Sequence, residues 1–288
     1  MIILCLIIAH LIGDFYLQTD KMVKNKSKYL RRHLLHHFVL SMLVLTGFYL
    51  RNDLTYFFKQ AALPSIAIVF FHYGIDRIKI LLLHTYFKQP IRQFYLFILD
   101  QALHIGAVIL VCIIFLDFDL TSYTNHFNVI LSQEAGQNIS TINTILFLIL
   151  MFIISTTVSS HFIKLLVGIL PDHLSLYEGK YVIKREQTEA SHMASQPIPS
   201  ISEEFTYLVN KKQHLSRGVY IGYLERLLVI VLIVNNAFTS IGFIVAAKSI
   251  VRFKQMDDRD FAEYFLLGTL SSIFLGVIYG VIIKIVLT

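Results

Sequence analysis

Three pairs of histidine and aspartate stand four residues apart within apolar stretches of this sequence. They are His10 with Asp14, His72 with Asp76 and, in reverse order, Asp100 with His104. Residues four apart lie on one face of an α-helix, so the two members of each pair project together if these stretches are helical. Inserting an ionisable side chain into the middle of a membrane costs roughly 2.5–3.5 kcal/mol of free energy, so such residues are functional candidates by default. Imidazole and carboxylate groups suit zinc, iron or manganese, so the pairs predict a divalent metal site.

Other ionisable residues accompany these pairs, with His33 and its neighbours at the start of the second apolar stretch. The predicted metal ligands are His10, His36, His37, His72, Asp76 and His104, with zinc expected before iron or manganese. The predicted catalytic residues are Asp14, Asp76, Asp100 and Lys79. No HExxH, His-box or Cys motif in the sequence identifies the metal. The alternative is that the pairs only form hydrogen bonds that hold membrane helices together.

The composition is that of a membrane protein. Of the 288 residues 56% are hydrophobic and 15% charged, and the mean hydropathy is +0.65, whereas soluble domains have about 25% charged residues. We expect an all-α, polytopic transmembrane bundle, because helices satisfy their own backbone groups in lipid. The net charge of +6 then reflects cytoplasmic loops and does not predict a nucleic-acid partner. The two cysteines lie in separate apolar stretches and predict neither a disulfide nor a metal site.

About 20 helical residues cross a bilayer, and eight stretches are candidate spans. They are residues 1–18, 34–50, 61–84, 93–117, 142–169, 219–235, 237–253 and 262–287. The sixth and seventh meet at a polar pair, Asn235-Asn236, and two crossings are favoured over a re-entrant pair. The first stretch lacks the basic start and small-residue cleavage site of a signal peptide, so we expect a retained span. The predicted domains are a five-span unit (1–169), a cytoplasmic polar linker (170–218) and a three-span unit (219–288).

The charges of the loops predict the orientation. Residues 19–33 are rich in Lys and Arg, whereas residues 118–141 contain neither. Because basic residues concentrate in cytoplasmic loops, residues 19–33 and the linker are predicted to be cytoplasmic and both termini external. With these directions, the three histidines lie deeper in the membrane and the three aspartates nearer the cytoplasm. We therefore expect a site that faces the cytoplasm, in the plasma membrane.

A second polar set lies at the predicted cytoplasmic ends of the last three spans. Its members are Glu225, Arg226, Lys248, Arg252 and Glu263. Arginine binds phosphate and carboxylate groups through its planar fork, so this set is predicted to bind an anionic substrate. Ion pairs within the set that merely hold the helices together are the open alternative.

Several motifs carry a resemblance to a known family. The run from His10 to Gln18 reads His-x-x-x-Asp-Phe-x-x-Gln, a basic loop follows it, and the pattern His-x-x-x-Asp-x-x-Lys ends at Lys79. These features resemble an uncharacterised bacterial family of polytopic membrane proteins, a domain of unknown function. The C-terminal half is similar to its longer members through Gly222-Tyr223-Leu224-Glu225-Arg226 and Ala246-Ala247-Lys248-Ser249. The resemblance implies no established activity.

Three hypotheses follow. The first is an intramembrane metal-dependent hydrolase, in which the metal lowers the pKa of a bound water and the substrate is anionic, phosphate-bearing or lipid-bearing. The second is an ion- or proton-coupled transporter that uses the same His/Asp cluster. The third is a non-enzymatic membrane scaffold or sensor whose segment 170–218 binds a cytoplasmic partner. In each case the lipid bilayer is a partner and no nucleic acid is expected.

Overall fold

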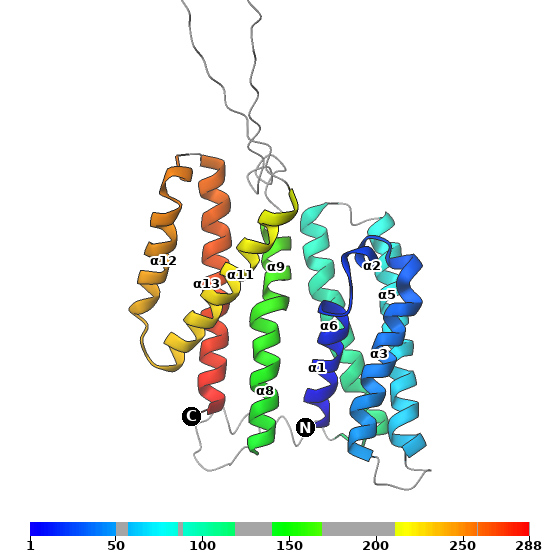
Figure 1. Cartoon of the computed structure of the whole chain (residues 1–288). Coiled ribbons are helices and arrows are strands. Elements are labelled where there is room, and N and C mark those ends of the chain that lie inside the picture. The colour runs from blue at the N-terminus through cyan, green and yellow to red at the C-terminus, as the bar shows by residue number, and fades with distance from the viewer. Residues whose placement is uncertain (50–56, 86–88, 119–139, 169–210, 258, 288) are drawn as a thin grey trace, which may run out of the picture.

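The computed structural model describes residues 1–49, 57–85, 89–118, 140–168, 211–257 and 259–287. Within them every regular element is a helix and none is a strand. The elements are α1 (Ile2–Phe15), α2 (Asp20–Lys24), α3 (Lys26–Tyr49), η1 (Phe58–Ala62), α5 (Leu63–Thr85), α6 (Pro90–Phe115), α8 (Thr141–Ile153), η2 (Ile154–Val158), α9 (Ser159–Val167), α11 (Lys211–Val234), α12 (Ser240–Val251), η3 (Phe253–Gln255) and α13 (Arg259–Leu287) (Figure 1).

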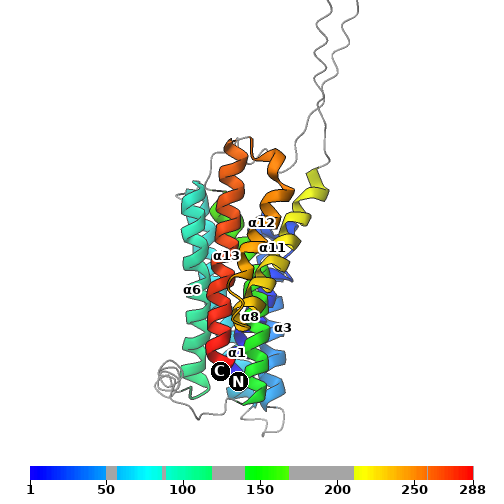
Figure 2. The ribbon, with the colours of Figure 1, turned by 90° about the vertical axis from the view of Figure 1, so that its left-hand side faces the viewer.

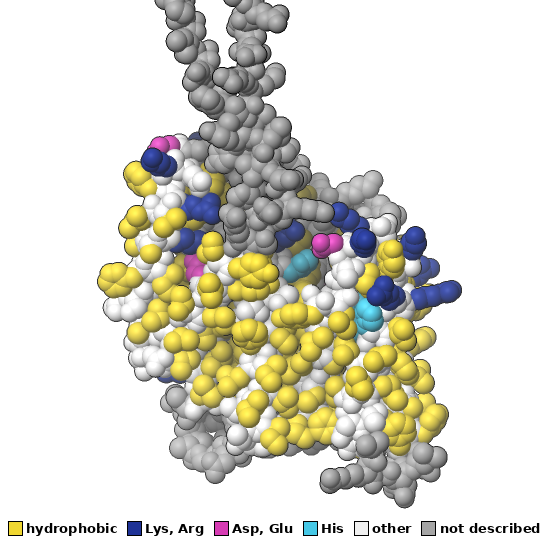
Figure 3. Space-filling view, viewed as in Figure 1, with side chains coloured by type: hydrophobic (Ala, Val, Ile, Leu, Met, Phe, Trp, Pro, Cys, Tyr) yellow, Lys and Arg dark blue, Asp and Glu magenta, His cyan; other side chains and the backbone are white. Residues whose placement is uncertain are grey.

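Three helical segments are long and apolar enough to cross a membrane: Pro90–Phe115, Thr141–Val167 and Phe261–Leu287. Two shorter helices, Ile2–Phe15 and Ser240–Val251, are also apolar. Figure 3 shows apolar side chains over the middle of one face, with Lys and Arg gathered toward one end. The prediction of an all-helical membrane protein is confirmed to this extent, and the number of eight spans stays a prediction.

The first bundle consists of α1, α3, α5 and α6. These helices pack on one another side by side (Figures 1 and 2). A cluster of buried apolar side chains fills one half of the bundle, and its members are Leu6, Leu45, Ala61, Ile68, Val108, Val111 and Cys112. Leu6 precedes His10 along α1, whereas Val108 follows His104 along the oppositely directed α6. The apolar half therefore lies on the side of the histidines that is away from the aspartates.

The second bundle consists of α11, α12 and α13, and its closest packing is between α11 and α13. Gly276 and Gly280 stand one turn apart on α13, and a Cβ at either would lie 3.0 Å or less from Val229 or Ile233 of α11. Small residues at this spacing let membrane helices approach closely. The segment α8–η2–α9 lies between the bundles: it packs on α1 and α6 on one side and on α11 and α13 on the other (Figure 1).

Two helices begin well before the predicted spans. Helix α3 begins at Lys26 rather than at residue 34, and α11 begins at Lys211 rather than at residue 219. Charged residues such as lysine and arginine are good helix formers, so a helix continues past the apolar stretch that defines a span. The predicted break is present: Asn236 has φ 61° and ends the turn after α11, a conformation that asparagine tolerates. Of the predicted linker, residues 170–210 lie outside the described residues.

Candidate metal centre

The first bundle turns polar side chains from all four of its helices into its interior. Five histidines and two aspartates are at most 4% exposed: His10, His33, His37, His72, His104, Asp76 and Asp100. Asp14 is slightly more accessible, with 13% of its side chain exposed. Helix periodicity explains the convergence, because each His/Asp pair occupies one face of its helix. The layer predicted from the sequence therefore exists as a cluster of side chains.

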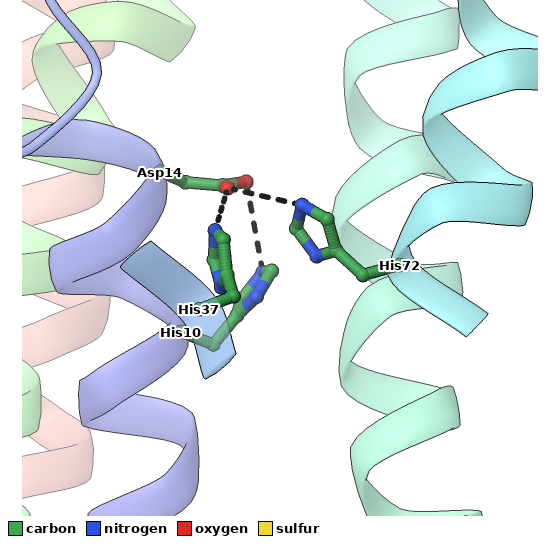
Figure 4. Close-up of side chains that lie close together, drawn as sticks. All are labelled: His10, Asp14, His37 and His72. Atoms are coloured by element: carbon green, nitrogen blue, oxygen red, sulfur yellow. Dashed lines mark hydrogen bonds and ion pairs between the residues drawn. The ribbon is translucent and has the colours of Figure 1, made fainter. Parts of the chain in front are cut away.

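Asp14 is the centre of the histidine contacts. His37 Nε2 donates to its Oδ1 across 3.1 Å, and His10 Nε2 lies 3.7 Å from Oδ2 (Figure 4). His72 Nε2 lies 3.8 Å from Oδ1 and His33 Nε2 lies 3.3 Å from it. Ligand atoms at the usual 2.0–2.2 Å from a tetrahedral zinc are roughly 3.3–3.6 Å apart. The distances from Asp14 to the four histidines, 3.1–3.8 Å, thus lie on both sides of the range that one ion would require.

The other two aspartates are each paired with a lysine. Lys26 Nζ donates to Asp76 Oδ1 across 2.5 Å, and Lys79 Nζ donates to Asp100 Oδ2 across 2.5 Å. Charge-assisted hydrogen bonds of this kind are stronger than neutral ones. Gln101 is shared, because its amide donates to Asp14 Oδ2 at 3.1 Å and to Asp100 Oδ2 at 3.3 Å.

Several buried ligand atoms in the cluster have no hydrogen-bond partner within the described structure. They are His10 Nε2, His104 Nε2, Asp76 Oδ2 and Asp100 Oδ1. His104 Nδ1 donates to the backbone carbonyl of Asp100 across 2.8 Å, which leaves its Nε2 as the nitrogen with a free lone pair. A histidine held in this way through one nitrogen is oriented for metal binding through the other. Unpartnered buried polar atoms are costly, and a cation is one group that would satisfy these lone pairs.

Three overlapping sets of side chains have ligand atoms within 4.8 Å of one another. They are His10, Asp14, His37 and His72; His33, His72 and Asp76; and Asp76, Asp100 and His104. Nitrogen and oxygen ligands in such sets are compatible with zinc, iron or manganese, so the expectation of a divalent metal agrees with side chains that could hold one. The geometry alone does not identify the metal.

The predicted ligands are brought together except for one. His36 is half-buried on α3 and belongs to none of the three sets. Two participants were missed: His33, placed only at the mouth of the second span, and Lys26, counted with the loop. Their spacing carried the signal, because Lys26, His33 and His37 are seven and four residues apart and therefore share one face of α3.

The C-terminal polar set lies in the second bundle. Glu225 accepts a hydrogen bond from Lys248 Nζ at 2.8 Å, Arg252 Nη1 donates to Gln255, and the exposed Glu263 pairs with Arg259 at 3.0 Å. No hydrogen bond or ion pair joins this set to the His/Asp cluster in the described part of the chain, and α8, η2 and α9 stand between.

Arg226 is 1% exposed, and its hydrogen bonds reach α13 of the second bundle and the adjoining segment η2–α9. Its guanidinium donates to the backbone carbonyls of Ser155 and Thr156 and to the hydroxyls of Ser160 and Ser272. Ser155 and Thr156 belong to the π-helical turn η2, where the i to i−4 hydrogen-bond ladder is interrupted. Arg226 therefore satisfies carbonyl groups that the π-turn leaves available.

Gly13 fixes how closely α1 approaches His37. A Cβ at this position would lie 2.5 Å from His37 Cε1 and 2.7 Å from its Nε2. We expect Gly13→Ala to displace the imidazole from Asp14 and to weaken zinc binding about 10-fold or more, as changes in ligand orientation do. Zinc titration of the purified protein measures this. Gly106→Ala in α6 is the matched control, because nothing lies within 4 Å of a Cβ there; an equal loss in both variants would contradict the role of Gly13.

Comparison with known proteins relates one part of the chain to a protein family. No curated protein and no solved structure matches the sequence significantly. All members of the three ligand sets lie between residues 10 and 104. That part of the chain falls within a segment that matches a protein family. Residues 2–131 match the family described as "Protein of unknown function (DUF3307)", so the N-terminal half of the chain carries the sequence pattern of an uncharacterised family.

Proposed function

We propose that the protein is a membrane-embedded, metal-dependent hydrolase whose centre is the His/Asp cluster of the first bundle. One observation carries the proposal: histidine and aspartate ligand atoms from α1, α3, α5 and α6 converge, and several of them are buried and lack a hydrogen-bond partner among the described residues. Structural hydrogen bonding between membrane helices would use these atoms. A divalent ion would use them and would lower the pKa of a bound water, which supplies a nucleophile at neutral pH.

The position of the cluster within the bundle favours an enzyme over a transporter. The half of the bundle beyond the histidines is filled by apolar side chains, among them Leu45 and Val111, which are fully buried. Ions crossing the membrane need polar groups along the whole path. A site that is closed on one side and reachable past Asp14, Lys26 and Lys79 on the other suits a reaction with a substrate from one side.

The membrane orientation is part of the proposal. We infer that eight segments cross an inner (plasma) membrane and that both termini are external. The N-terminus and the end of α13 lie at one end of the molecule (Figure 1), and Lys and Arg gather at the other (Figure 3), as the preference of basic residues for the cytoplasm requires. Lys284 near the end of α13 donates to Asn236 across 2.5 Å, which supports two crossings by α11 and α12.

The substrate is proposed to be anionic, either phosphate-bearing or lipid-bearing. Lys26 and Lys79 are the cations adjacent to the ligand sets, whereas Lys248 is engaged with Glu225 in the other bundle. A substrate at the centre would therefore meet the lysines of α3 and α5. The predicted binding role of the C-terminal set gives way to a role in holding α11, α12 and α13 together.

Elemental analysis of the purified protein tests the proposal. Wild-type protein is expected to carry a transition metal, and His72→Ala is expected to lose it, because His72 belongs to two of the three ligand sets. Hydrolysis of 4-nitrophenyl phosphate, measured with both proteins and with chelator-treated wild type, reports the chemistry. Wild-type protein that neither carries nor takes up a transition metal would overturn the proposed function.

A further inference from the structure

We propose that the cluster binds one divalent ion, at His10, Asp14, His37 and His72, and that Lys26 and Lys79 take the place of a second ion. The inference rests on the proposed function and deepens it, because it states which of three overlapping ligand sets is the metal site. It also gives the two lysines a definite role.

The three aspartates differ in the cations that they contact. In the described part of the chain, Asp76 and Asp100 each contact a lysine ammonium at 2.5 Å, whereas the ion-pair contacts of Asp14 are all with histidines. Neutral histidines offer lone pairs but no charge to balance a carboxylate. Asp14 is thus the carboxylate whose charge no ammonium group at contact distance balances, and four histidines surround it.

The ligand sets also compete with one another. His72 Nε2 lies 3.8 Å from Asp14 Oδ1, 3.6 Å from Asp76 Oδ2 and 3.0 Å from His33 Nε2. One nitrogen lone pair binds one ion, so the first and second sets cannot both be filled. In the third set, His104 Nε2, Asp76 Oδ2 and Asp100 Oδ1 have no hydrogen-bond partner in the described structure. Each of its two carboxylates, however, already contacts a lysine ammonium through its other oxygen, which balances its charge. Among the described residues, the set around Asp14 is the one whose only carboxylate contacts no lysine ammonium.

Charge balance leads to the same number of ions. Three carboxylates and two ammonium groups leave the cluster with one negative charge. A single divalent ion brings it to one positive charge, which one anion, such as hydroxide or a substrate oxygen, neutralises. Two divalent ions would leave three positive charges in a buried site, and uncompensated charge is costly there. The lysines thus allow three carboxylates to lie in one buried cluster that holds a single ion.

The experiment loads the purified full chain, in detergent, with Zn²⁺ alone and measures bound zinc per chain after excess metal is removed. Wild type is expected to bind one ion. Asp14→Asn is expected to retain less than a tenth of that zinc, and Asp76→Asn to retain it all. The double variant Lys26→Met/Lys79→Met, which frees Asp76 and Asp100, is expected to bind two ions. Size-exclusion chromatography and helical circular dichroism exclude unfolding as the cause of a loss.

The outcomes separate this inference from the proposed function. Two ions in wild type would overturn the inference and leave a metal-dependent hydrolase in place, whereas no ion would overturn both. Zinc retained in Asp14→Asn but lost in Asp76→Asn would assign the ion to another set and overturn the inference. A lysine double variant that still binds one ion would show that Lys26 and Lys79 do not substitute for a second ion. The wild-type measurement needs no variant to fold.

Discussion

Replacing His37 with alanine is expected to weaken zinc binding on the order of 100-fold, whereas replacing the adjacent His36 leaves it unchanged. His37 is 3% exposed and donates to Asp14, and it belongs to the ligand set that contains His10 and His72. Outer contacts of a metal ligand are worth about 10–100-fold in affinity, so a direct ligand is expected to be worth at least the upper part of that range. Competition with a coloured zinc chelator measures the affinity.

The neighbouring histidines provide a control within one turn of one helix. His36→Ala removes the same side chain from α3 at a half-buried position outside the ligand sets. Any effect of helix propensity or detergent contact would appear in both variants. Equal affinities for the two variants would mean that His37 packs against the cluster without binding the ion.

Arg226→Leu is expected to destabilise the protein by about 3–5 kcal/mol, the largest effect on stability that we foresee. The substitution keeps only a shorter apolar side chain and removes the charged donor from the carbonyls of Ser155 and Thr156 and from the hydroxyls of Ser160 and Ser272. Hydrogen bonds to charged groups contribute about 1.5–3 kcal/mol each, and breaking a buried charged network costs about 3–5 kcal/mol. Denaturant unfolding in micelles, followed by circular dichroism, measures the change.

Two further variants serve as controls for Arg226→Leu. Arg259→Ala removes an arginine whose side chain is 89% exposed, and such surface changes are usually within about 0.5 kcal/mol. Arg226→Lys keeps the charge but lacks the planar fork that reaches several acceptors at once, so it is expected to restore only part of the stability. Full stability in Arg226→Leu would show that the π-turn carbonyls find other donors.

The His/Asp cluster could be predicted because its information is local. Spacing of four residues fixes the face of each helix, and the charges of the loops fix the direction of each helix. Together these determined that His10, His72 and His104 share one level, which the ring contacts of His10 and His72 with His104 match. Depth in a membrane is a single coordinate, and sequence patterns report it well.

Lateral position is the coordinate that the sequence left open. The sequence predicts a depth for Glu225, Arg226 and Lys248 similar to that of the cluster but does not predict their neighbours, and they belong to another bundle. Which helices are neighbours depends on packing. Arg226 binds a π-helical turn in an apolar run, and no residue pattern in the sequence predicts that turn. Lys26 was missed for a simpler reason: helix α3 extends beyond the apolar stretch that was used to define a span.

The segment α8–η2–α9 has one more consequence, for how this architecture is assembled. The family match ends at residue 131, before α8 begins, and every member of the ligand sets lies within the matched segment. Helices α8 and α9 cover α1 and α6 on one side, and η2 presents to α11 the carbonyls that Arg226 holds. This segment thus joins the bundle that holds the ligand sets to the bundle that holds Arg226.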